Sequence, residues 1–146
     1  MKVVQVPFGF FPDPPGGTEV YVDALCRALE PLGTRCVVAA PAAVESAYEH
    51  RGLSVRRYAS GPAPALEALY SAENPFAVKS FSKILDEEKP DVLHLHASTR
   101  DVSSALLVEA RKRGIATVFT YHTPTATCQR GTLMRWGRVL CDGKMR

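Results

Sequence analysis

The chain has 146 residues, 46% of them apolar and 23% charged, which supports one globular domain with a sizeable core and excludes a disordered chain. Eighteen basic against fifteen acidic residues give a net charge of +3, too small an excess to predict nucleic acid as a partner. The longest uninterrupted apolar run, residues 36–44, contains Pro41 and is too short to span a bilayer.

The N-terminus and the cysteines predict a location. Only Lys2 precedes the first apolar stretch, and no cleavage-like site follows it, so a secretory signal is not expected. Cys26 and Cys36 lie within apolar patterns, as buried free thiols commonly do, and four cysteines are too few to staple a small fold. We therefore expect a reducing, cytoplasmic setting.

Short apolar runs and helical patterns alternate along the chain. The first run, KVVQVPF, is rich in β-branched residues and precedes a Pro- and Gly-rich loop, after which Thr18 stands where a helix cap is expected. The predicted strands are 2–8, 35–40, 53–58, 91–97 and 116–121, and the predicted helices are 18–32, 45–51, 65–70, 76–88 and 102–113.

Strands that alternate with helices predict an α/β fold, a doubly wound parallel sheet with helices on both faces. In such sheets, ligands bind beyond the carboxyl ends of the strands. The segments that follow the predicted strands and hold polar or glycine residues are 9–18, 97–100 and the chain from His122 onward. We expect the function to lie in these segments.

The first candidate is the pair Gly16-Gly17 at the start of the predicted helix. Two glycines let a ligand approach the backbone closely, and the free N–H groups of a helix N-terminus favour anions. The spacing differs from the G-x-G-x-x-G fingerprint and no Walker lysine follows, so NAD and P-loop chemistry are disfavoured. The pair is either a phosphate-binding turn or a simple turn into the helix.

Histidines form the second and third candidates. Strand alternation places His94 and His96 on one face near the ligand-binding edge, but metal sites usually need three or four ligands and only Asp101 stands nearby, so a hydrogen-bonded structural pair is favoured. His122 follows the strand ATVFTY directly. A histidine there points into the crevice and titrates near neutral pH, as a catalytic or sugar-contacting group would, and a structural role is the alternative.

Residues 123–146 are predicted to form an irregular, cysteine-bearing tail. Cys128 and Cys141 are half of a zinc site or one disulfide, and neither is complete within the chain, so a chance spacing is favoured and both are weak metal candidates. No sixth strand or closing helix is predicted in the tail. We therefore expect residues 1–146 to be a single domain that belongs to a longer protein.

Three motifs at strand ends resemble the N-terminal domain of family 4 glycosyltransferases, which have the two-domain GT-B architecture. They are GGTEVYV after the first strand, PDVLHLHA at the fourth and TVFTYHTPT at the fifth. The resemblance spans nearly the whole chain. It implies a Rossmann-like N-terminal domain that binds the acceptor, a C-terminal domain that binds a nucleotide sugar, and transfer with retention in the cleft between them.

The resemblance also implies roles for single residues. His122 would be the catalytic residue that contacts the transferring sugar. Gly16 and Gly17 would lie by the donor diphosphate or the acceptor, and Glu19 would support the glycine loop. The substrate-binding residues implied in this way are Gly16, Gly17, Glu19, His96 and Thr123, with His96 at the edge of the cleft.

No metal cofactor is implied, because helix N-termini and basic side chains can stabilise a leaving nucleoside diphosphate. The expected partners are a nucleotide-sugar donor, a sugar, lipid or metabolite acceptor, and the C-terminal donor-binding domain, with peripheral membrane contact if the acceptor is lipid-linked. The family's paired glutamates have no counterpart here, so the chain alone is expected to be inactive. The alternative function is a non-catalytic module that binds a sugar or a nucleotide.

Overall fold

The computed structural model describes residues 1–62, 73–122, 133–135 and 138–141, and its main feature is a six-stranded sheet. The strands are β1 (Lys2–Val6), β2 (Arg35–Ala42), β3 (Ser46–His50), β4 (Leu53–Ala59), β5 (Val92–Leu95) and β6 (Ala116–Phe119). Their order is β3-β4-β2-β1-β5-β6, and all neighbours pair in parallel except β3 with β4. A separate antiparallel pair is formed by β7 (Met134–Arg135) and β8 (Val139–Leu140).

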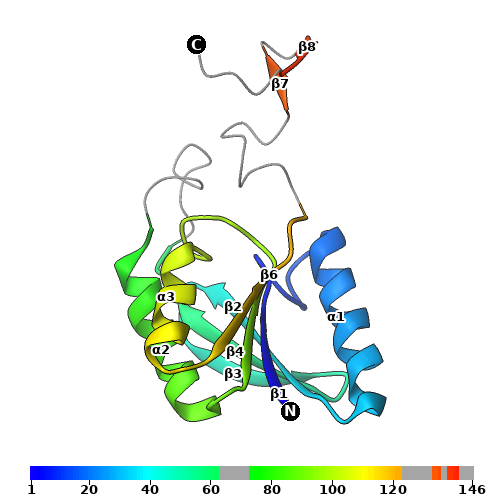
Figure 1. Ribbon diagram of the computed structural model, residues 1–146, viewed down its shortest axis with the longest axis vertical. Helices are drawn as coiled ribbons and strands as arrows, with labels where there is room; N and C mark the ends of the chain where they lie inside the picture. The colour runs from blue at the N-terminus through cyan, green and yellow to red at the C-terminus, as the bar shows by residue number, and fades with distance from the viewer. Residues whose placement is uncertain (63–72, 123–132, 136–137, 142–146) are drawn as a thin grey trace.

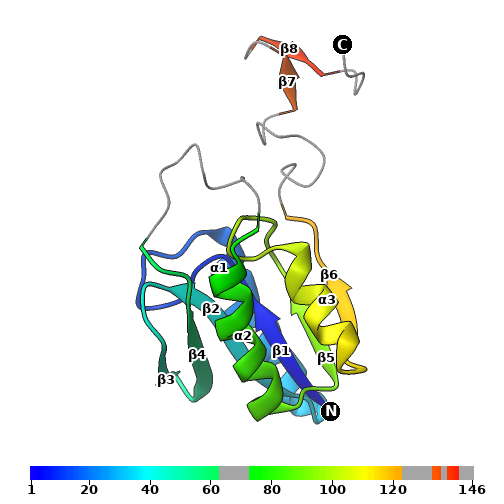
Figure 2. The ribbon, with the colours of Figure 1, turned by 90° about the vertical axis from the view of Figure 1, so that its left-hand side faces the viewer.

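Helices cover both faces of the sheet. α1 (Gly17–Leu29), continued by a 3₁₀ turn (Glu30–Leu32), lies on one face, and α2 (Pro75–Glu88) and α3 (Ser104–Lys112) lie on the other (Figure 1). In the perpendicular view α2 and α3 stand side by side in front of the strands (Figure 2). The predicted doubly wound α/β architecture is therefore confirmed, and within the described residues no helix is long and apolar enough to cross a membrane.

The central strand β1 divides its side chains between two cores. Val4 and Val6 pack with Phe81 of α2 and other residues of the α2–α3 face. Val3 packs with Val22 and the other residues of the α1 face. This alternation is the consequence of strand geometry, since successive side chains point to opposite faces. Gln5 therefore points to the α1 face, where it is fully buried.

Two sequence predictions were wrong in detail. Residues 45–51 form the edge strand β3 instead of a helix, because Arg51 and Gly52 adopt positive φ and close a two-residue hairpin that pairs Ser46–His50 with β4. The helix expected to be capped by Thr18 begins earlier, with Gly16 as its N-cap. The helix predicted at 65–70 lies outside the described residues.

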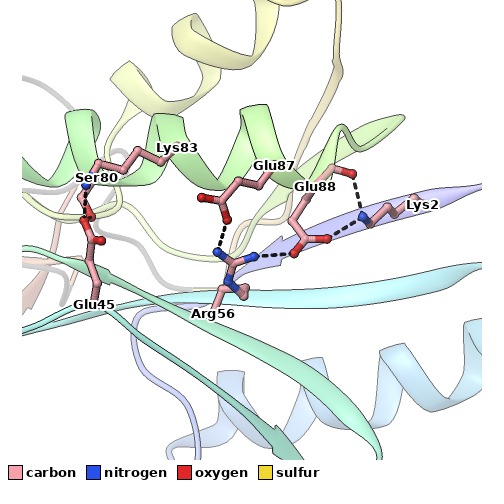
Figure 3. A network of polar contacts seen from close by, with 7 residues as sticks. All are labelled: Lys2, Glu45, Arg56, Ser80, Lys83, Glu87 and Glu88. Carbon is pink, nitrogen blue, oxygen red and sulfur yellow. Dashed lines mark hydrogen bonds and ion pairs between the residues drawn. The ribbon is translucent and has the colours of Figure 1, made fainter.

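Ion pairs attach α2 to the sheet, as Figure 3 shows. Glu88 of α2 accepts from Lys2 Nζ of β1 at 2.5 Å and from Arg56 Nη1 of β4 at 2.7 Å, while Arg56 also pairs with Glu87. Closer to the N-terminus of α2, Ser80 and Lys83 each donate to the Glu45 carboxylate at 2.8 Å. These polar contacts thus join α2 to β1, to β4 and to Glu45, which precedes β3.

A buried arginine holds the loop between β1 and α1. The Arg57 side chain is only 5% exposed, and its guanidinium donates to the Phe10 carbonyl at 2.6 Å and pairs with Asp13 at 2.8 Å. Tyr48 donates to the Phe11 carbonyl and accepts from Arg57 at 3.2 Å. Side chains of β4 and β3 therefore hold the loop that leads to the glycine pair.

Arg57→Met removes this charge and leaves the loop carbonyls without their donor. Because the buried Phe10 carbonyl stays in place without a hydrogen-bond donor, we expect the free energy of unfolding to fall by about 2–4 kcal/mol. Urea denaturation measures the change. Arg35→Met, which alters an exposed arginine of β2, is the control and should stay within about 0.5 kcal/mol of wild type; equal effects would contradict the role given to Arg57.

Candidate functional site

The candidate site lies at the carboxyl ends of three adjacent strands, β1, β5 and β6. Parallel pairing brings these ends to one edge, where His96 N–H donates to the Val6 carbonyl at 3.0 Å and Thr120 N–H donates to the Leu95 carbonyl at 2.9 Å. The N-terminus of α1 reaches the same edge, because Tyr21 contacts the ring of His122. The glycine pair and the histidines predicted from the sequence therefore share one region.

Glu19 holds the glycine turn in shape. Its carboxylate is buried and accepts from the Gly16 N–H at 2.8 Å and from the Gly9 N–H at 3.3 Å. A Cβ added at Gly16 would lie 3.0 Å from the Glu19 carboxylate, so a larger residue there would push it aside. Both carboxylate oxygens are engaged by backbone, which suits the supporting role implied for Glu19.

Gly17 differs from Gly16 in its surroundings. Among the residues that the structure describes, a Cβ added at Gly17 would meet nothing within 4 Å, so no packing against these residues requires a glycine there. Gly17 is exposed and is the first residue of α1, whose N-terminal N–H groups favour anions. The open space in front of Gly17 leaves room for a ligand to approach the helix N-terminus.

Three histidines and one tyrosine pack in series along this edge. The ring centroids of His94 and His96 are 3.9 Å apart, and those of His96 and His122 are 5.4 Å apart. The Tyr21 ring lies 4.9 Å from His122 and 5.9 Å from His96. The prediction that His94 and His96 share one face near the edge is confirmed, and His122 joins them from the segment that follows β6.

His96 is enclosed and neutral. It is 2% exposed, and its Nε2 and Nδ1 lie 2.7 Å from Gln5 Oε1 and 3.1 Å from His122 Nε2. Burial, together with the neighbouring His94 and His122, lowers the pKa of His96 to about 3. The pKa of a histidine in the unfolded chain is 6.5, so the unfolded state takes up a proton at His96 at a higher pH than the folded state does. Lowering the pH from 6.5 toward about 3 therefore reduces the free energy of unfolding.

His94 is half-buried and points toward β6. Its Nε2 lies 2.7 Å from Thr120 Oγ1, and burial, with a smaller effect of His122, lowers its pKa. Among the residues that the structure describes, no group of three or more His, Cys, Asp or Glu side chains could hold a metal ion. His94 and His96 are both hydrogen-bonded to neighbouring side chains, as the favoured structural alternative predicts.

Three neighbours of the histidines were missed by sequence reasoning. Gln5 is a lone polar residue in an apolar strand, and that contrast was the available signal. Thr120 follows β6 and precedes His122 by two residues, as expected for side chains on one face. Tyr21 lies one helical turn after Gly17, which places its ring beside the histidines.

Two of the predicted residues, Thr123 and Cys128, lie outside the described residues. Cys141 is described; it follows β8, is exposed, and its N–H donates to the Leu133 carbonyl at 2.7 Å. The prediction that Cys128 and Cys141 belong to a metal site or a disulfide therefore stays untested.

Comparison with known proteins gives the family. A family model described as Glycosyltransferase Family 4 matches residues 15–141. The chain belongs to glycosyltransferase family 4. The match includes Gly16, Gly17, Glu19, His96 and His122, so the whole candidate site apart from β1 lies within the family domain. A search of curated protein sequences gives no match.

Solved structures agree with this family in their fold. Sucrose-phosphate synthase from Thermosynechococcus elongatus superposes with a TM-score of 0.65 at 16% identity, with 95% of this chain matched to 37% of that chain. The catalytic domain of starch synthase IV from Arabidopsis thaliana, bound to ADP and acarbose, gives 0.58 at 17% identity, with 83% of this chain matched to 34% of that chain. The family 4 chain thus has the fold of a GT-B N-terminal domain and spans about a third of each of these proteins.

An epimerase shares the fold as well. UDP-GlcNAc 2-epimerase from Neisseria meningitidis, bound to UDP-GlcNAc, gives a TM-score of 0.53 at 16% identity, with 82% of this chain matched to 31% of that chain. At such identities the likeness concerns the fold alone, so the family match carries the assignment to glycosyltransferases.

The two glycines of the family 4 site should respond differently to alanine. Gly16→Ala crowds the Glu19 carboxylate and replaces a favourable N-cap, so we expect the free energy of unfolding to fall by about 1 kcal/mol. Gly17→Ala enters open space and improves helix propensity, so stability should stay the same or rise by up to about 1 kcal/mol. Urea denaturation of the two variants compares them, and equal losses would contradict this account of Gly17.

Proposed function

We propose that this chain is the acceptor-binding half of a retaining glycosyltransferase that uses a nucleotide diphosphate sugar. The observation that carries the proposal is the contact of Tyr21 with His122 in a chain that belongs to glycosyltransferase family 4. This contact sets the α1 N-terminus, with its glycine turn, beside a histidine at the carboxyl end of a strand. Such an edge is where ligands of α/β sheets bind.

In the proposed reaction, an acceptor hydroxyl attacks the anomeric carbon on the face from which the nucleoside diphosphate leaves. The bond from the sugar to the diphosphate breaks as the new glycosidic bond forms, the hydroxyl proton passes to the departing diphosphate oxygen, and configuration is retained. Gly17 gives the reacting groups access to the N-terminus of α1, whose N–H groups favour the negative charge. His122 contacts the transferring sugar and orients it, and Thr123, the next residue of the sequence, contributes to substrate binding.

The proposal extends to the partners of this half. The donor would be held by a C-terminal domain, and transfer would take place in the cleft between the domains, from which water is excluded so that transfer outruns hydrolysis. The acceptor is a sugar, a lipid or a metabolite with a free hydroxyl, and a lipid-linked acceptor would bring the protein to a membrane surface. A cytoplasmic location, where nucleotide sugars are at hand, fits this chemistry.

His122→Ala in the full-length protein should lower kcat/KM for sugar transfer by about 10- to 100-fold, because contacts to the transferring sugar are lost. Steady-state kinetics with the donor and acceptor measure the loss. Leu32→Ala, a change of an exposed side chain at the opposite end of the sheet, is the control and should keep the wild-type rate. Unchanged turnover in His122→Ala would overturn the role given to this residue.

Transfer should not require a divalent metal, since the N–H groups of the α1 N-terminus, with basic side chains that the family resemblance implies in the C-terminal domain, can stabilise the leaving diphosphate. We expect the rate of the full-length protein to stay within about twofold of its starting value after chelation with EDTA. Product formation is compared before and after EDTA and again after Mg²⁺ is added back. A loss of activity that Mg²⁺ restores would contradict this part of the proposal.

A further inference from the structure

We propose that Gln5 and His96 form a positioning relay that holds the His122 ring with its proton on Nε2 and its lone pair on Nδ1. The inference concerns which atom of His122 meets the substrate, and in that respect it rests on the proposed function. The relay itself is a property of the protein without substrate. Gln5 and His96 act through His122 and are positioning residues.

The relay begins at Gln5. Its side chain is fully buried on the α1 face, with Nε2 turned toward Cys36 Sγ at 3.9 Å and Oε1 at 2.7 Å from His96 Nε2. A carbonyl oxygen accepts hydrogen bonds and cannot donate them. With the Gln5 amide in this orientation, the proton of the His96 ring lies on Nε2.

The second step follows from the charge of His96. Burial keeps this imidazole neutral, so it carries a single ring proton, and Nδ1 is left as a bare acceptor. The atom that faces Nδ1 is His122 Nε2, at 3.1 Å. A short contact between two bare nitrogens would be repulsive, so His122 Nε2 must carry a proton and donate it.

The other ring of the series cannot reverse this direction. His94 packs against His96 with centroids 3.9 Å apart, and its Nε2 is engaged by Thr120 Oγ1, so it offers His96 no competing hydrogen bond. Both nitrogens of His96 are already within hydrogen-bond distance of Gln5 and His122. The Gln5 oxygen therefore decides which nitrogen donates and which accepts in both hydrogen bonds.

The relay ends at an amide, which neither takes up nor releases a proton at neutral pH. It is thus a positioning device and not a route for protons. With Nε2 committed to His96, a neutral His122 presents a lone pair and no N–H to its ligand. The group that it recognises is a proton donor, which in the proposed reaction is a sugar or acceptor hydroxyl.

The test is to find the proton on His122 by ¹⁵N NMR of the full-length protein labelled in its histidine rings. The spectrum is recorded at about pH 8.5, two units above the ordinary histidine pKa of about 6.5, where histidine rings are neutral. In a neutral ring, the nitrogen that carries the proton and the nitrogen that does not have separate resonances. The expected result is a protonated Nε2 and a bare Nδ1 on His122. A proton on Nδ1, or an even mixture, overturns the proposal, and this measurement on wild type depends on no variant.

Gln5→Leu tests the origin of the effect. Without the acceptor oxygen, the His96 proton moves to Nδ1, so His122 Nε2 must accept and its resonance should change from the protonated to the bare type. Val3→Ala, a core change on the same strand and face, is the matched control and should leave the tautomer unchanged. An unchanged tautomer in Gln5→Leu, or the same change in Val3→Ala, overturns the relay.

Kinetics separate this inference from the proposed function. We expect Gln5→Leu to lower kcat about tenfold with little change in KM, while Val3→Ala keeps the wild-type kcat. A wild-type kcat in Gln5→Leu with a reversed tautomer overturns the assignment of Nδ1 as the substrate-facing atom. If the wild-type protein transfers no sugar, the proposed function fails, and the NMR result still decides whether the relay exists.

Discussion

The structure depends on the double burial of its central strand. β1 pairs in parallel with β2 on one side and β5 on the other, and each of its faces is covered by helices. Every side chain of its buried part must therefore find a partner inside the protein. Four of the five residues of β1 are valines or a charged end residue, and Gln5 alone places a polar group in the core, where it can be satisfied only by other buried polar groups.

Much of the fold could be predicted because its local patterns agree with its packing. The apolar period of α1 and α2, and the Pro and Gly residues that end the helices, place these elements close to their observed bounds. β3 was missed because only Tyr48 and His50 of its five residues are even half-buried, so an edge strand of this kind carries little alternation. Its position is set by the Arg51-Gly52 turn and by pairing with β4, which no periodicity reveals.

The candidate site could be located but not assembled from the sequence. The rule that ligands bind at the carboxyl ends of parallel strands points to Gly16, His96 and His122, and strand alternation puts His94 with His96. The contact between Gln5 and His96 depends on the register of β1 against β5, in which Gln5 lies opposite His94. Residues 91 positions apart acquire this relation only through the sheet, and single-sequence reasoning has no access to it.

The polar contacts of α2 and those of the loop between β1 and α1 differ in exposure, so we expect salt to affect them differently. The contacts of α2 include pairs between half-exposed side chains, such as Lys83 with Glu45, and dissolved ions screen such charges over about 8 Å at physiological ionic strength. Arg57 pairs with the exposed Asp13, but it also donates from a buried position to the Phe10 carbonyl, where ions have little access. Rising ionic strength should therefore weaken the ion pairs of α2 and leave the conformation of the loop before Gly16 unchanged. The geometry of the candidate site should then depend little on salt concentration.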